Sequence, residues 1–130
     1  EKGVPMAGGS IIVVLATDAP LLPIQCKRLA RRATTGLAWV GGIGTNGSGD
    51  IFLAFATGNR IPRGRALVDL RMVAPEQMNG LFLAAAEATE EAILNSMIAA
   101  TTTTGFKGRT VHAIPHHRLR DVMAKHGRLS

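Results

Sequence analysis

Residues 8–20, GGSIIVVLATDAP, carry the strongest structural signal in this sequence. A serine follows two glycines and opens a continuous apolar run that is rich in β-branched residues. Such a run is typical of a strand that is covered on both faces. We therefore predict a strand over residues 10–17. Ser10, at its start, is either an ordinary strand-start residue or a functional one.

A helix is expected directly after this strand. Asp18 can cap its beginning, and Pro20 and Pro23 are tolerated only in a first turn. Apolar residues then recur every three or four positions and form one stripe, made of Leu22, Cys26, Leu29, Ala33, Leu37 and Val40. We predict one continuous helix that ends at Gly41 and Gly42, because glycine favours helix ends.

The remaining sequence contains further strand-like and helix-like segments. We expect, in order, a glycine-rich loop over 41–49, an apolar strand over 50–57, an exposed loop over 58–65, an ambiguous segment over 66–73, a helix from Pro75 to about Ala100, a loop over 101–108, a last strand over 109–114 and a closing helix over 116–126. The long helix is expected to bury Met78, Leu81, Phe82, Ala85, Ala92, Ile93 and Met97 and to expose Glu87, Glu90 and Glu91. This order predicts an α/β or α+β fold, with helices layered on a sheet.

The composition is that of one globular domain. The chain has 130 residues, 46% of them hydrophobic, which is enough to bury a core. Its single cysteine, Cys26, excludes an internal disulfide framework and a cysteine-based zinc site. The apolar runs are too short to span a bilayer, and the start of the chain lacks a signal-peptide pattern. We expect no membrane partner and a cytoplasmic location, with the periplasm left open. Because the chain begins with Glu1 rather than Met, we expect a fragment or a processed product.

The net charge of +6 raises the possibility of nucleic-acid binding. Basic residues gather in two clusters, made of Lys27, Arg28, Arg31 and Arg32 and of Arg60, Arg63 and Arg65. No aromatic residue is interleaved with either cluster, so neither offers a platform on which bases could stack. We interpret both clusters as solvated surface and expect no nucleic-acid partner.

Neither a cofactor nor a metal is predicted. The glycine-rich loop lacks the lysine of a phosphate-binding loop, and it lies between a helix and a following strand, the wrong order for a dinucleotide site. Its glycines instead allow the backbone to come close to another group and can deliver Ser48 and Asp50 to the start of a strand. A simple tight connection is the alternative. The histidines, His112, His116, His117 and His126, lack a carboxylate cluster and are expected at the surface.

Ser10 has one route to becoming a nucleophile that needs no other side chain. If the bond between Gly9 and Ser10 were cut, Ser10 would carry a free α-amine, which is partly neutral at physiological pH and can act as a base. One residue would then supply both nucleophile and base. Glycine before the serine suits self-cleavage, because it tolerates a strained backbone. From the residues alone, a plain strand start remains the alternative.

Three stretches resemble the small subunit of the DmpA-type aminopeptidases, which include L-aminopeptidase/D-esterases and β-peptidyl aminopeptidases. They are GGSIIVVLATDAPLLPIQCKRLARRATTGLA from Gly8, NGSGDIFLAFATGN from Asn46 and EATEEAILNSMIAATTTTGFKGRTVHAIP from Glu87. The likeness runs from about Gly8 to the C-terminus. Its most specific features are the serine-initiated strand, ATDAPL and NGSGDIFLAF.

This resemblance implies an ornithine acetyltransferase-like fold and a precursor that cuts itself between Gly9 and Ser10. Residues 1–9 would be the tail of a large subunit and residues 10–130 the small catalytic subunit. Ser48 and Asp50 would support the nucleophile and its amine, with Asp50 standing where some relatives carry glutamate. An α-β-β-α sandwich would be completed by the missing large subunit, and such heterodimers would assemble into larger homo-oligomers.

The implied activity is release of N-terminal amino acids from peptides, amides or esters through an acyl-enzyme on Ser10. An acyltransferase of the same fold, acting on an amino-acid acceptor, is one alternative, although that group generally uses threonine as the nucleophile. A basic nucleic-acid-binding module is the other alternative. An uncut chain would have no free amine on Ser10 and would be inactive as an aminopeptidase.

Overall fold

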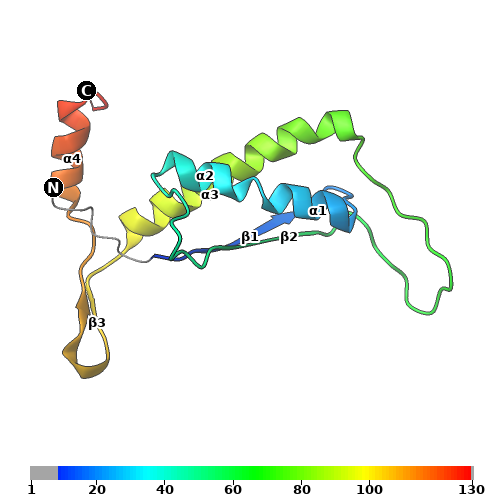
Figure 1. Ribbon diagram of the computed structural model, residues 1–130, viewed down its shortest axis with the longest axis horizontal. Coiled ribbons are helices and arrows are strands. Elements are labelled where there is room, and N and C mark those ends of the chain that lie inside the picture. The colour runs from blue at the N-terminus through cyan, green and yellow to red at the C-terminus, as the bar shows by residue number, and fades with distance from the viewer. Residues whose placement is uncertain (1–8, 130) are drawn as a thin grey trace. The chain divides into compact units, whose positions relative to one another are not determined.

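The computed structural model describes residues 9–129 (Figure 1). Apart from Gly9, the predicted tail over residues 1–9 therefore lies outside the described residues. The chain divides into two compact units, one reaching to Glu90 and one beginning at Glu91.

The first unit is built on a parallel pair of strands, β1 (Ile12–Thr17) and β2 (Ile51–Ala56). Their register pairs Ile12 with Ile51 and continues to Thr17 opposite Ala56. Both strands were predicted, although each begins one or two residues later than expected. Their side chains alternate in burial, so this chain covers one face of the sheet and leaves the other open, with Ile12 71% exposed.

Two short helices, α1 (Pro23–Ala30) and α2 (Ala33–Trp39), replace the single helix that was predicted. The helix is broken at Arg31 and Arg32, where the Arg32 N–H donates to the carbonyl of Leu29 at 2.9 Å and tightens the last turn. Asp18 is not the cap, because α1 begins at Pro23 and its N-cap residue is Leu22.

Gln25 is the buried polar residue that the apolar stripe failed to predict. Gln25 is 2% exposed, and both polar atoms of its side chain form hydrogen bonds. Oε1 accepts from the N–H of Leu22 at 3.1 Å, and Nε2 donates to the carbonyl of Val73 at 2.6 Å. Nε2 also lies 3.5 Å from Sδ of Met78. Because these bonds satisfy the amide, Gln25 ties the start of α1 to the segment that leads into the long helix.

The long helix, α3 (Met78–Ala99), follows a short 3₁₀ turn, η1 (Pro75–Gln77). In the first unit α1, α2 and the beginning of α3 lie on the same side of the sheet (Figure 1). The core between them is formed by Leu21, Leu29, Met78 and Ala85, with Leu15, Ala54 and Ala56 from the strands. Of the expected buried residues, Leu81 and Phe82 are half-buried, whereas Ala92 and Met97 are exposed; Ala86 and Thr89 are buried instead.

The segment between β2 and η1 has no regular secondary structure, including the ambiguous residues 66–73. Asn59 links the two ends of this segment. Its side chain accepts from the N–H of Arg71 at 2.9 Å and donates to the carbonyl of the same residue at 2.8 Å. The exposed residues between them thus form one loop with fixed ends.

The second unit contains a small antiparallel pair, β3 (Thr103–Thr104) and β4 (Thr110–Val111), joined by η2 (Phe106–Gly108). The predicted loop over 101–108 therefore contains a strand, and the predicted strand over 109–114 is shorter than expected. It pairs with β3 and not with the main sheet. The closing helix, α4 (His116–Lys125), is confirmed.

Two negative findings apply to residues 9–129. No helix there is both long and apolar enough to cross a membrane. No three of its His, Cys, Asp and Glu residues lie together as a metal ion would require.

Gly36 is expected to be the least tolerant position of α2. A Cβ at Gly36 would overlap the carbonyl oxygen of Ala86 and lie 2.8 Å from Cβ of Thr89. Gly36→Ala should therefore push α2 away from α3 and lower the free energy of unfolding by about 1–3 kcal/mol, as overpacking does. Urea denaturation of the complete protein that contains this chain measures the change.

Gly80→Ala is the matched control, because Gly80 also lies in a helix but nothing surrounds its added Cβ within 4 Å. Higher helix propensity should leave that variant as stable as the parent or more stable, by up to about 1 kcal/mol. Equal midpoints for the two variants would contradict the close helix contact at Gly36.

Candidate active site

Ser10 lies just before β1 and is exposed. Its Oγ accepts a hydrogen bond from the backbone N–H of Gly49 at 2.9 Å. The side chain is therefore held by the main chain of the segment that leads into β2. A hydroxyl that accepts this bond still has its own proton to donate elsewhere.

The register of the two strands brings this segment to Ser10. The N–H of Ile51 donates to the carbonyl of Ile11 at 2.9 Å, which begins the ladder. The side chain of Asp50 adds one more hydrogen bond at the start of this ladder, because its Oδ1 accepts from the N–H of Ile11 at 3.1 Å. The carboxylate thus holds the amide that directly follows Ser10 in the chain.

The backbone at Gly49 approaches Ser10 so closely that a larger residue would crowd the hydroxyl. An added Cβ would lie 3.2 Å from Oγ of Ser10 and 3.8 Å from its Cβ. The glycine-rich loop was predicted either to deliver residues to a strand start or to be a plain connection. Its last glycine donates to Ser10, and Asp50 accepts from the Ile11 N–H, so the loop brings both residues to the start of β1. The N–H of Gly49 is a contact of Ser10 that the sequence did not predict.

A hollow of about 330 Å³ lies beside these residues. It is lined by Gly9, Ser10, Ile11, Leu37, Gly41, Gly42, Ile43, Gly44, Thr45, Ser48 and Asp50. All three predicted catalytic residues and both residues of the predicted cleavage bond therefore meet at one place. Gly41 and Gly44 have positive φ values of 94° and 60°, which lets the loop turn tightly around the hollow.

Ser48 is half-buried at the wall of this hollow. Its backbone N–H donates to the carbonyl of Thr45 at 2.8 Å and closes a turn. This turn fixes the direction in which the chain enters Gly49 and Asp50. Apolar walls come from Leu37 and Ile43, two residues whose place here had no signal in the sequence.

The four histidines lie at the surface of the second unit. His112, His116, His117 and His126 are all exposed and belong to the second unit. His116 instead donates from Nε2 to the carbonyl of Ile98 at 2.9 Å, near the end of α3. The expectation of surface histidines is confirmed.

Residues 2–111 match peptidase family S58. The chain belongs to peptidase family S58. The resemblance to the DmpA-type aminopeptidases is thereby confirmed. Family S58 is a peptidase family, which disfavours both the acyltransferase and the nucleic-acid-binding alternatives.

Relatives of this S58 chain agree with the assignment. It is 47% identical to beta-peptidyl aminopeptidase BapA of Sphingosinicella microcystinivorans, covering 100% of this chain and 33% of that protein. It superimposes with a TM-score of 0.85 on the L-aminopeptidase D-Ala-esterase/amidase of Ochrobactrum anthropi, at 48% identity over 99% of this chain and 37% of the other. That structure is described as a variant of the Ntn hydrolase fold and a prototype for the serine aminopeptidases.

A β-aminopeptidase of Burkholderia sp. matches this S58 chain with a TM-score of 0.83 and 46% identity, over 93% of this chain and 36% of its own. The chain thus has the fold of one part of an Ntn hydrolase, and the α/β class is confirmed. It spans about a third of the length of the relatives it matches.

Gly49→Ala should disturb Ser10 without removing any polar group. The added methyl would displace Oγ by a few tenths of an ångström from its present position. Because small misplacements of a reacting atom are costly, we expect aminoacyl-anilide hydrolysis by the complete protein to fall about tenfold to a hundredfold.

Gly47→Ala serves as the control in the same loop, since nothing lies within 4 Å of its added Cβ. That variant should keep nearly the parental rate. Parental rates in both variants would show that the Gly49–Ser10 contact does not position the hydroxyl.

Proposed function

We propose that this chain carries the nucleophile of a self-processing N-terminal-nucleophile serine aminopeptidase. Ser10 is the nucleophile, the bond between Gly9 and Ser10 is the processing site, and residues 10–130 form the small catalytic part. The observation that supports this best is the 2.9 Å bond from the Gly49 N–H to Oγ of Ser10, at a hollow that Asp50 and Ser48 also line.

Self-cleavage begins at the hydroxyl of Ser10. Oγ attacks the carbonyl carbon of Gly9, and the bond from that carbon to the Ser10 nitrogen breaks as the nitrogen takes up the hydroxyl proton. An ester between Gly9 and Ser10 remains. Water hydrolyses this ester, which leaves a carboxylate on Gly9 and both a free hydroxyl and a free α-amine on Ser10.

The processed serine then acts on substrate. Oγ attacks the carbonyl of the first residue of a peptide, amide or ester while the α-amine of Ser10 accepts the hydroxyl proton. The amine returns this proton to the leaving group, and an acyl-enzyme remains. The amine next takes a proton from water, and the resulting hydroxide attacks the ester. As the ester bond breaks, the amine gives this proton to Oγ, which releases the amino acid and restores the hydroxyl and the neutral amine of Ser10.

Three groups of this chain assist these steps. The N–H of Gly49 points at Oγ and stabilises the negative charge that develops there as the proton leaves. Asp50 holds the Ile11 amide, and its carboxylate favours the protonated α-amine one residue away. Ser48 lines the same hollow and orients the amine.

The rest of the protein completes the fold under this proposal. The open face of the sheet is apolar, because it carries the exposed side chains of Ile12, Val14, Ile51, Leu53 and Phe55. A second sheet from the remaining two-thirds of the protein would cover this face, and its own helices would complete an α-β-β-α sandwich. We further propose that these assemblies form homo-oligomers and that the protein is cytoplasmic.

Ser10→Ala should abolish both processing and hydrolysis, because each step needs the same hydroxyl. Ser10→Cys keeps a nucleophile and should still cut, more slowly, since a thiol fits an oxygen-shaped site poorly. Mass spectrometry of the purified protein reads the N-terminus that cleavage creates, and an aminoacyl-anilide assay reads turnover. If the Ser10→Ala protein is still cleaved and still hydrolyses substrate, Ser10 is not the nucleophile and is only the residue that precedes a strand.

Asp50→Asn should lower the anilide rate but leave the fold intact. Asparagine keeps an oxygen that can accept from the Ile11 N–H and loses only the charge. We expect a decrease on the order of 10²–10⁴-fold, the size of acid–base assistance, and a comparable partial loss for Ser48→Ala. Asp50→Ala, which also loses the acceptor, should be worse than Asp50→Asn. Equal rates for all three variants and the parent would exclude both residues from the mechanism.

A further inference from the structure

The hollow beside Ser10 has apolar walls that take no part in the proposed chemistry. Leu37 and Ile43 form these walls. Leu37 is half-buried, whereas Ile43 is 82% exposed. A substrate group that covered Ile43 would remove apolar surface from water, which favours binding. The walls are therefore suited to hold an apolar part of the substrate.

Both walls belong to one hydrogen-bonded turn at the end of α2. The N–H of Gly42 donates to the carbonyl of Leu37 at 2.9 Å. A Cβ on Gly42 would overlap the side chain of Leu37, so the loop packs tightly against this leucine. Ile43 follows directly in the chain. The turn thus sets the positions of Leu37 and Ile43 together.

Gly9 marks the place beside Ser10 that the substrate takes. In the proposed self-cleavage, Oγ of Ser10 attacks the carbonyl carbon of Gly9. In the proposed hydrolysis, the same atom attacks the carbonyl carbon of the first residue of the substrate, which therefore lies where Gly9 lay before processing. Gly9 lines the hollow, and a Cβ added to it has no atom within 4 Å. A side chain on the first residue of the substrate has room there.

The size and charge of the hollow restrict which side chain suits it. Its volume of about 330 Å³ is at the lower end of the range for ligand sites, which suits one residue better than a longer peptide. Among the described residues that line it, Asp50 alone is charged. A substrate carboxylate would lose hydration there without gaining a cation, and Asp50 would repel it. An apolar side chain meets neither penalty.

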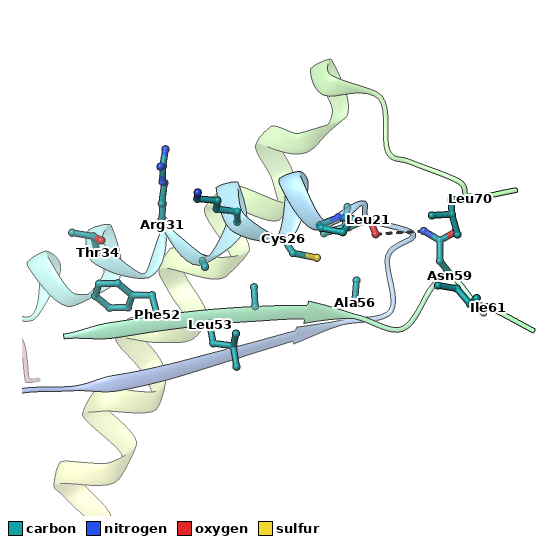
Figure 2. A pocket seen from close by; sticks show the side chains of 14 residues that line it. Leu21, Cys26, Arg31, Thr34, Phe52, Leu53, Ala56, Asn59, Ile61 and Leu70 are labelled. Atoms are coloured by element: carbon teal, nitrogen blue, oxygen red, sulfur yellow. Dashed lines mark hydrogen bonds between the residues drawn. The ribbon is translucent and has the colours of Figure 1, made fainter. Parts of the chain in front are cut away.

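A larger hollow, of about 670 Å³, lies elsewhere on the first unit (Figure 2). Cys26, Phe52 and Ile61 are among its lining residues, and Figure 2 shows Ile61 at one end of it. It shares no lining residue with the hollow beside Ser10 and contains neither Gly9 nor Ser10. Ile61 therefore provides a matched comparison for Ile43.

We propose that the hollow beside Ser10 binds the side chain of the first residue of the substrate, and that Leu37 and Ile43 determine its specificity. The preferred substrates are peptides, amides or esters that begin with an aliphatic residue rather than with aspartate or glutamate. This inference rests on the proposed function, because it takes Ser10 as the nucleophile.

Ile43→Ala in the complete protein tests the inference with leucyl-anilide and glycyl-anilide as substrates. We expect the ratio of their kcat/KM values, leucyl over glycyl, to fall about tenfold, the size of effect that a few apolar carbons have in a specificity pocket. Both rates come from the same sample, so the ratio does not depend on the fraction of folded or processed protein. Ile61→Ala is the control, since Ile61 is also exposed, at 65%, but lines the larger hollow. It should keep the parental ratio.

Ile43→Glu tests the same wall through charge. A carboxylate at this position should favour a basic first residue, so the ratio of kcat/KM for lysyl-anilide over leucyl-anilide should rise about tenfold at low salt. The rise should become smaller at high salt, because salt screens charges that are exposed to solvent. Glutamate at position 61 should change neither ratio.

Three results would overturn the inference. One is an unchanged leucyl-to-glycyl ratio in Ile43→Ala, and another is an equal change in Ile61→Ala, which would assign the side chain to the larger hollow or to no particular site. A parent protein that hydrolyses no anilide would overturn the proposed function and this inference with it. Hydrolysis by the parent with ratios that Ile43 does not affect would overturn the inference alone.

Discussion

The parallel pairing of β1 with β2 is the constraint on which the site depends. Because Ile12 lies opposite Ile51, the residues just before each strand also lie side by side. That places Gly49 against Ser10 and Asp50 against the Ile11 amide. A shift of the register by one residue would separate these partners and turn every apolar side chain of one strand to the other face. The burial of the sheet therefore enforces the geometry at Ser10.

Sequence reasoning reached the strands, the long helix and the closing helix because each has a strong periodic or continuous apolar pattern. It missed the break at Arg31 and Arg32, because the apolar stripe continues across the break. It also missed Gln25, since a polar residue on a buried face is satisfied only by partners distant in sequence, here Val73. Such partners come together only in the tertiary structure, so the local sequence pattern does not reveal them.

The candidate site was predicted unevenly for a similar reason. Ser10 is marked by the glycines before it and the strand after it, and Ser48 and Asp50 were connected with it through resemblance to a family. The N–H of Gly49 belongs to the backbone, so no residue type identifies it in advance. The short distance of 3.2 Å between Oγ of Ser10 and a Cβ added at Gly49 becomes visible only in the folded structure.

Under the proposed processing at Ser10, the open apolar face of the sheet bears on the order of events during maturation. A separate small chain would have to find its partner by diffusion while Ile12 and Val14 were exposed to water and to other unfolded chains. A single precursor makes the same association intramolecular, at an effective concentration on the order of millimolar for a short connection. Cleavage directly before Ser10 would then follow assembly. The covalent link would act as a temporary tether, and its removal would cost little once the two parts had buried their surfaces against each other.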